Sequence, residues 1–345
     1  MVERRRIQKT GSSSYIVTLP KEWVDSLGMK PGDYVTVHRH GNRLIIAPSI
    51  VEAQQLSTEV KVLSPDVSLD EVFRIVIAGY LAGYSTIKIV MPENVPGLPK
   101  LINEVKKLAR SKLAGIEVID ETFNSIVFKV LLDLEELPLM KALRRVHLIV
   151  NSMLSDAVKA FKAMNADIAE AVVQRDDEVD RFHFVIARQL SIALLDFRIM
   201  ESLGLTSSVE ALNYRILARN MERIADHSVN IARLTYIRPA ECKYCDELAG
   251  FGEKALEIFN TAMDSIYKLH RKIAEEVISI NAKFLKDLRE LVFDKIMVDQ
   301  EVTPGERIVS IMMHDSLRRI MRYSNGIAES ALNIKAAKES LIEVK

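Results

Sequence analysis

Residues 219–232 read Arg-Asn-Met-Glu-Arg-Ile-Ala-Asp-His-Ser-Val-Asn-Ile-Ala, with two carboxylates four positions apart. Helical spacing places Glu222 and Asp226 on one face, one turn from each other. A second acid pair, Asp176 and Asp180, lies upstream in a run that also has a helical pattern. Like charges at this spacing repel unless a cation relieves them. The pairs are therefore either two solvated helix faces or, if they meet across a bundle, an oxygen-lined metal site.

Both stretches resemble the motifs of the PhoU family of phosphate-uptake regulators. The family's first motif, acid-x-x-x-Asp, matches Asp176 to Asp180, preceded here by Ala-Glu-Ala-Val-Val at 169–173. Its second motif, Glu-Arg-Ile-x-Asp-His-x-x-Asn-Ile-Ala, is matched nearly in full from Glu222 to Ala232. The resemblance covers most of the C-terminal two-thirds of the chain. It implies an all-α, six-helix bundle of two three-helix repeats, and multinuclear metal clusters held at these motifs.

The resemblance makes four carboxylates the candidate metal ligands: Asp176, Asp180, Glu222 and Asp226. Further candidates are Asn230, Asp177, His227 and His183. Hard oxygen donors suit magnesium, manganese, calcium or iron better than zinc. The family precedent favours iron or manganese, and magnesium, calcium and zinc stay open.

The helical part is expected to divide into repeat 1 at 138–238 and repeat 2 at 242–340. Helices are predicted over 139–164, 167–197, 206–236, 248–277, 282–299 and 305–337. In the last helix Arg318 and Arg322 align with Glu222 and Asp226. Guanidinium cannot ligate a metal. We therefore expect one metal site per chain, with the arginines paired across helices to Glu290 and Asp294.

The first fifty residues have a β pattern, with strands predicted at 15–19, 34–38 and 43–47. A short helix over 20–28 and a Gly41-Asn42 hairpin turn separate them. The runs Gly-x-Ser-x-Tyr-Ile-Val-Thr-Leu-Pro-Lys-Glu at 11–22 and Leu-Gly-Met-Lys-Pro-Gly-Asp at 27–33 resemble the AbrB/MazE/SpoVT family of DNA-binding domains. In that family two chains interleave hairpins into one small β barrel, so the resemblance implies a homodimer.

Charge agrees with DNA as a partner. The first fifty residues hold eight basic and four acidic residues, a net charge of +4 in a chain whose total is zero. Basic side chains contact phosphates, and hydroxyls add hydrogen bonds to them. The candidate DNA contacts are Arg4, Arg5, Arg6, Lys9 and Ser13. The alternative is a solvated N-terminus on a domain that serves only to dimerise the chain.

Residues 57–133 alternate strand and helix patterns, which indicates a small α/β subdomain. Strands are predicted at 60–62, 86–90, 116–119 and 125–130, and helices at 69–83 and 98–113, the first capped by Ser68 with Glu71. No Gly-rich phosphate loop is present. We expect a spacer or a dimerisation element.

The 345 residues suggest two or three domains. No stretch of about twenty apolar residues occurs and the N-terminus is charged, so we expect a cytoplasmic protein without membrane insertion. Cys242 and Cys245 are half a zinc site, which a partner chain could complete, or a redox pair. Incidental cysteines are the interpretation we favour.

The predicted fold class is thus multidomain α+β: a dimeric β barrel, an α/β subdomain and a helical bundle. The predicted function is regulation of phosphate uptake, by a DNA-binding transcriptional regulator with a metal-binding sensor bundle. The alternative is a protein that does not bind DNA and regulates a phosphate transporter or signalling partner through its bundle. An enzyme is not expected, because the chain lacks the paired Glu-x-x-His motifs of di-iron bundles and any Ser/His/Asp arrangement.

Overall fold

The structure, a computed structural model, describes residues 3–40, 43–48, 57–132 and 137–339. The chain divides into two units, Met1–Gln55 and Leu56–Lys345. The predicted Gly41-Asn42 turn lies outside the described residues. Of the helices in the described part of the chain, none combines the length and apolarity needed to cross a bilayer.

The N-terminal unit consists of two small hairpins and one short helix. Strand β1 (Gln8–Thr10) pairs antiparallel with β2 (Ser14–Ile16), and β3 (Val35–His40) pairs antiparallel with β4 (Arg43–Pro48). Helix α1 (Lys21–Ser26) follows Pro20, as the sequence predicted. Strand β1 was not predicted, and β2 is shorter than expected. None of residues 3–37 and 44–48 is buried, so these residues of a single chain form no hydrophobic core.

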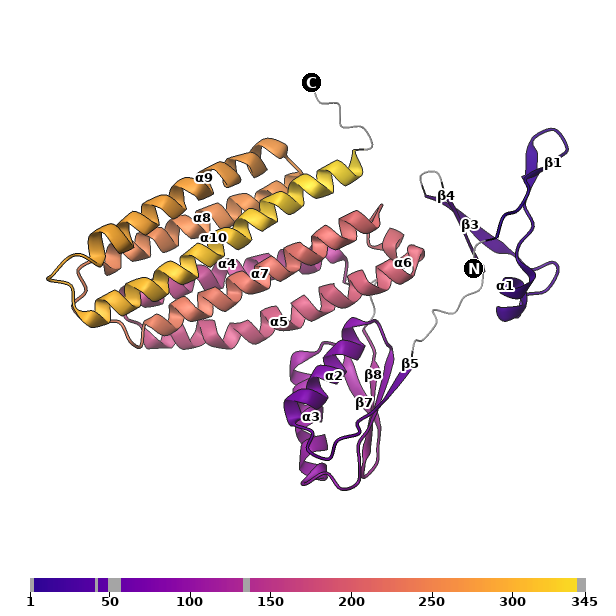
Figure 1. The fold of residues 1–345 in the computed structure, drawn as a ribbon, viewed down its shortest axis with the longest axis horizontal. Helices are drawn as coiled ribbons and strands as arrows, with labels where there is room; N and C mark the ends of the chain where they lie inside the picture. Colours follow the sequence, from indigo (N-terminus) through magenta and orange to yellow (C-terminus); the bar gives the residue numbers. More distant parts are fainter. Residues whose placement is uncertain (1–2, 41–42, 49–56, 133–136, 340–345) are drawn as a thin grey trace. The chain divides into compact units, whose positions relative to one another are not determined.

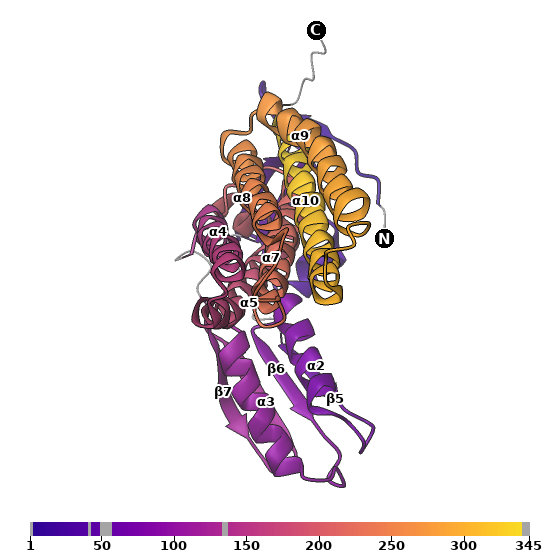
Figure 2. The ribbon, with the colours of Figure 1, turned by 90° about the vertical axis from the view of Figure 1, so that its left-hand side faces the viewer.

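Residues 57–130 alternate strands and helices around a hydrophobic core of their own. Their sheet has the order β5 (Ser57–Lys61), β6 (Thr86–Val90), β8 (Ser125–Val130) and β7 (Ile116–Glu121). Only β5 and β6 are parallel, because a helical crossover joins them. Helices α2 (Leu69–Leu81) and α3 (Leu98–Lys112) cover the same face of the sheet (Figure 2). Ser68 and Glu71 form the predicted capping box of α2.

The first half of the bundle contains α4 (Leu139–Ala163), α5 (Ala166–Leu195) and α7 (Ser208–Leu234), with the short α6 (Phe197–Ser202) before α7. Apolar residues recur every three or four positions along α4 and are buried against the neighbouring helices. Asn165 caps α5 and Ser207 caps α7 through their side chains. The three long helices agree with the sequence, whereas α6 was not predicted.

The second half contains α8 (Cys245–Lys268), α9 (Arg271–Arg289) and α10 (Pro304–Lys338). A π-helical segment, η1 (Glu290–Ile296), continues α9. Our predicted boundary between the first two helices, at 277–282, is wrong, because the chain turns at Leu269 with a φ of 44°. The helices of both halves lie side by side (Figure 1) and share one continuous hydrophobic core.

We had expected the two cysteines to be incidental, and this expectation is wrong. Cys242 and Cys245 form a disulfide at the start of α8, where the turn brings their Cα atoms to 5.5 Å. That separation is typical of disulfides. The bond closes the loop that joins the two halves of the bundle.

Candidate functional site

The two acid pairs lie on neighbouring helices, Asp176 and Asp180 on α5 and Glu222 and Asp226 on α7. Burial raises the pKa of Asp176 to about 6, and repulsion from Asp180 and Asp226 adds to the rise. Burial also raises the pKa of Glu222 to about 7, and repulsion from Asp226 contributes. The carboxylates of the two helices are therefore close enough to oppose one another's ionisation.

Two buried oxygen atoms at this place have no hydrogen-bond partner, Asp176 Oδ1 and Glu222 Oε2. Arginines of α7 supply part of the countercharge. Arg219 Nη1 is 3.1 Å from Glu222 Oε1, and Arg223 Nη1 is 2.9 Å from Asp226 Oδ2. Arg223 Nε lies 3.6 Å from Glu222 Oε2, which is too long for a hydrogen bond. Since unpaired buried oxygens cost free energy, a further cation at this position would stabilise the fold.

The donor chemistry therefore fits a hard cation, which prefers carboxylate oxygens. In the part of the chain that the structure describes, however, no three His, Cys, Asp or Glu side chains are grouped so as to hold a metal ion. The side chains of Asp176, Asp180, Glu222 and Asp226 would have to move together to complete a ligand shell. The metal assignment of these four residues stays a prediction.

The further candidates have other roles or exposed positions. His183 Nε2 lies 3.0 Å from Arg215 Nη1, and its Nδ1 lies 3.3 Å from the backbone oxygen of Ala218. Because Arg can only donate, Nε2 accepts and Nδ1 carries the proton. Burial, followed by the charge of Arg215, lowers the pKa of His183 to about 4. His183 is thus a neutral link between α5 and α7. His227 stacks on Tyr323 of α10, at 6.0 Å between ring centroids.

Sequence reasoning missed two cations that join the α/β subdomain to α5. Lys112, the last residue of α3, places its Nζ 2.5 Å from Asp177 Oδ1 and 3.6 Å from Asp180 Oδ2. Arg188 is buried on α5 and donates to two backbone oxygens at the end of α2, at 2.6 and 3.2 Å. The sequence offered one signal for the Arg188 contact, an arginine within an apolar stretch of helix. Because buried charges are almost always paired, such an arginine predicts a partner on another element.

The ion pairs that we expected in the second half are not formed. Glu290 and Asp294 lie in η1, where the chain leaves the α-helical register. Glu290 Oε1 is 3.7 Å from Lys286 Nζ, and Asp294 Oδ2 is 3.9 Å from Arg289 Nη1. Each acid thus pairs within its own continuous helix and not with an arginine of α10.

The arginines of α10 also have other neighbours. Arg318 donates to Asp315, one turn earlier, at 2.8 Å. Arg322 lines a pocket with Asn281 and Leu285 of α9. The sequence indicates how α9 of the second half aligns with α5 of the first half, because Ala-Glu at 274–275 repeats Ala-Glu at 169–170. In that alignment Asn281 and Leu285 replace Asp176 and Asp180, so both helices of the second half have lost their acids.

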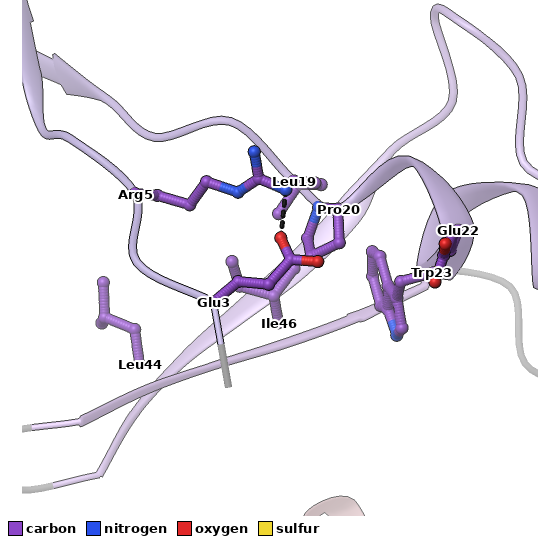
Figure 3. Close-up of a pocket in the computed structure, with 8 residues that line it drawn as sticks. All are labelled: Glu3, Arg5, Leu19, Pro20, Glu22, Trp23, Leu44 and Ile46. Atoms are coloured by element: carbon purple, nitrogen blue, oxygen red, sulfur yellow. Dashed lines mark hydrogen bonds and ion pairs between the residues drawn. The ribbon is translucent and has the colours of Figure 1, made fainter. Parts of the chain in front are cut away.

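The predicted DNA contacts are on the surface of the N-terminal unit. Arg4, Arg5, Arg6, Lys9 and Ser13 are all exposed, and Arg5 forms an ion pair with Glu3. Beside this pair lies an open pocket with apolar walls (Figure 3). Its lining residues are Glu3, Arg5, Leu19, Pro20, Glu22, Trp23, Leu44 and Ile46.

Known protein families match two separate segments of the chain. The PhoU domain matches residues 143–235, which include the two acid pairs. The family described as "Antidote-toxin recognition MazE, bacterial antitoxin" matches residues 8–52. The chain therefore contains a PhoU domain at residues 143–235 and a MazE-like domain at residues 8–52.

Individual sequence relatives match about a quarter of the chain. The phosphate-specific transport system accessory protein PhoU homolog of Streptococcus pneumoniae serotype 4 is 28% identical over 91 residues, 26% of this chain and 39% of the relative. Its namesake from Caulobacter vibrioides is 28% identical over 99 residues, 28% of this chain and 40% of the relative. The chain thus spans about two fifths of these relatives. The crystal structure of the phosphate transport system regulatory protein PhoU from Streptococcus pneumoniae is 16% identical, with a TM-score of 0.48 over 58% of this chain and 94% of that chain.

Proposed function

We propose that this protein is a homodimeric regulator of phosphate uptake, and not an enzyme, which joins a DNA-binding domain to a metal-binding helical bundle. The observation that carries the proposal is the presence of a PhoU domain and a MazE-like domain in one chain. The relatives of the first domain are named for phosphate-specific transport. The second domain is compatible with control of transcription.

The exposure of residues 3–37 and 44–48, none of which is buried, supports the dimer. Large apolar side chains are exposed in the strands of this N-terminal unit or directly before them, among them Ile7, Tyr15, Tyr34 and Leu44, with exposed fractions of 73, 70, 83 and 66%. A domain of this size cannot be stable with such residues in water. A second copy would cover them, as hairpin exchange does in the family that the sequence resembles. The dimer would also double the basic segment from Arg4 to Lys9.

DNA binding is tested by the salt dependence of affinity for random duplex DNA. Each neutralised phosphate contributes a slope of about −0.9 to log K against log salt. Replacing Arg4, Arg5 and Arg6 by Gln should flatten that slope, because those contacts are lost. Replacing the exposed Lys268, Lys272 and Lys283 of the bundle by Gln is the matched control and should leave it unchanged. A shallow slope in the wild type would favour the alternative, a regulator of a transporter or signalling partner that does not bind DNA.

In the proposed regulator Asp176, Asp180, Glu222 and Asp226 hold the metal, with iron or manganese favoured and magnesium, calcium and zinc open. A bound cation supplies the positive charge that offsets the mutual repulsion of these carboxylates. Elemental analysis of the D180A/D226A double variant should show metal lost while the dimer persists in gel filtration. The E290A/D294A variant is the control in the second half and should keep its metal. Unchanged metal in D180A/D226A would refute the assignment.

A further inference from the structure

Two faces of helix α5 contact other parts of the protein, and Asp180 lies where the two faces meet. One face carries Asp176 and packs toward α7, where the other acid pair lies. The other face carries Asp177 and Arg188 and contacts the α/β subdomain. Asp180 belongs to both, because its charge acts on Asp226 of α7 while its Oδ2 is 3.6 Å from Lys112 Nζ of the subdomain.

We propose that Lys112 and a metal ion compete for Asp180, so that the docking of the α/β subdomain depends on the metal content of the bundle. This inference rests on the metal site of the proposed function. It assigns residues 57–132 a regulatory contact with that site, beyond the spacer that the sequence suggested.

The ammonium of Lys112 is placed to act as a tethered cation. Its side chain is only 27% exposed, and Asp177 and Asp180 are both within ion-pair distance. A lysine ammonium is charged at neutral pH, and two carboxylates at these distances favour that charged form. Two cations cannot both bind the same carboxylate at close range. The positive charges of the lysine ammonium and the metal ion repel each other, and each weakens the attraction of the carboxylate for the other.

The geometry gives the displaced lysine an alternative position. Asp177 is 68% exposed, so Lys112 can keep that partner in water after it leaves Asp180. Arg188 holds the end of α2 through backbone oxygens and touches none of the acids. The subdomain would thus stay attached at Arg188 while the end of α3 is released. Through β5 the subdomain follows the N-terminal unit directly in the chain.

The test is a calorimetric titration of the full-length, metal-free protein with Mn²⁺. Lys112→Met should bind Mn²⁺ about two- to fivefold more tightly than the wild type, the range expected from removing a partly exposed ion pair. Lys106→Met is the matched control, because Lys106 on the same helix pairs with Glu121 inside the subdomain at 2.7 Å. It should bind Mn²⁺ like the wild type. Lys112→Arg, which keeps the charge, should stay close to the wild type.

Hydrogen exchange gives a second readout. Mn²⁺ should speed amide exchange at residues 109–114 in the wild type and in Lys106→Met, and should change nothing in Lys112→Met. Equal or weaker Mn²⁺ binding by Lys112→Met, with the wild type binding, would overturn the competition alone. Binding by Lys112→Met but not by the wild type would support it. Absence of binding in both would overturn the metal site and the competition together.

Discussion

In the first half of the bundle α4 ends at Met164 with a φ of 52°, and in the second half α8 ends in the same way at Leu269 with a φ of 44°. Five residues beyond each turn stands an Ala-Glu pair, at 169–170 and 274–275. The two halves therefore follow one backbone plan. At equivalent positions, however, the first half has Asp176, Asp180, Glu222 and Asp226, and the second half has Asn281, Leu285, Arg318 and Arg322.

This difference distinguishes the residues required for helix packing, which both halves have, from the acids of the candidate site, which only the first half has. The helices of the second half share the hydrophobic core of the first half although they lack all four carboxylates, so this packing does not depend on acids at those positions. Burying like charges is costly and is found chiefly where function requires it. The first half keeps the costly arrangement, and we therefore place the function there.

The largest expected effect tests whether the halves are one structure. Phe161 of α4 and Phe259 of α8 are both fully buried in the shared core. Replacing either by Ala should lower the free energy of unfolding by about 3–5 kcal/mol. In urea denaturation the helical bundle should still unfold in a single transition, because both residues belong to its one core. Two separate transitions in Phe259→Ala would mean that the halves fold independently.

A smaller effect should distinguish the halves by pH. In metal-free protein the raised pKa of Glu222, about 7 against an ordinary 4.5, means that the folded state holds a proton which the unfolded state has lost. Stability should therefore fall as pH rises from about 4.5 to about 7. Glu222→Gln should make this pH-dependent fall in the free energy of unfolding smaller by about 1–3 kcal/mol. Thermal or urea unfolding at several pH values between about 4.5 and about 7 measures it. Glu290→Gln, its control in the second half, should leave the slope unchanged. A slope that Glu222→Gln leaves unchanged would show that Glu222 does not contribute to it, whereas Asp176, with its pKa of about 6, should keep part of the slope.

The smallest effect concerns Arg318, which occupies the position of Glu222. Its ion pair with Asp315 is on the surface, with exposed fractions of 37 and 47%. Arg318→Gln should therefore change the free energy of unfolding by no more than about 0.5 kcal/mol. A loss above about 2 kcal/mol would mean that the guanidinium replaces a structural cation in the second half.

Local signals predicted much of the fold. The Ser68 and Glu71 capping box and the helical spacing of the two acid pairs depend on neighbours in the chain, and each has the expected structure. The break between α8 and α9 was missed because Leu269 adopts the left-handed conformation without the Gly or Pro that usually marks such a turn. We extended the helix across it.

Contacts between distant segments were the part that sequence could not provide. Lys112 and Asp180 are far apart in the chain, and nothing in either helix shows that α3 ends beside α5. The pairing of Glu290 and Asp294 with α10 was wrong because a π-helical segment changes the direction of their side chains, which α-helical spacing cannot foresee.

The docking of the α/β subdomain on α5 restricts how this protein can be recombined with its relatives. A chimaera that keeps this α5 but deletes residues 57–132 would leave the guanidinium of Arg188 without its two backbone acceptors and would uncover Phe184. A relative's helix grafted in its place would have to supply both surfaces at once. The bundle and the subdomain are therefore exchanged successfully only as a single block.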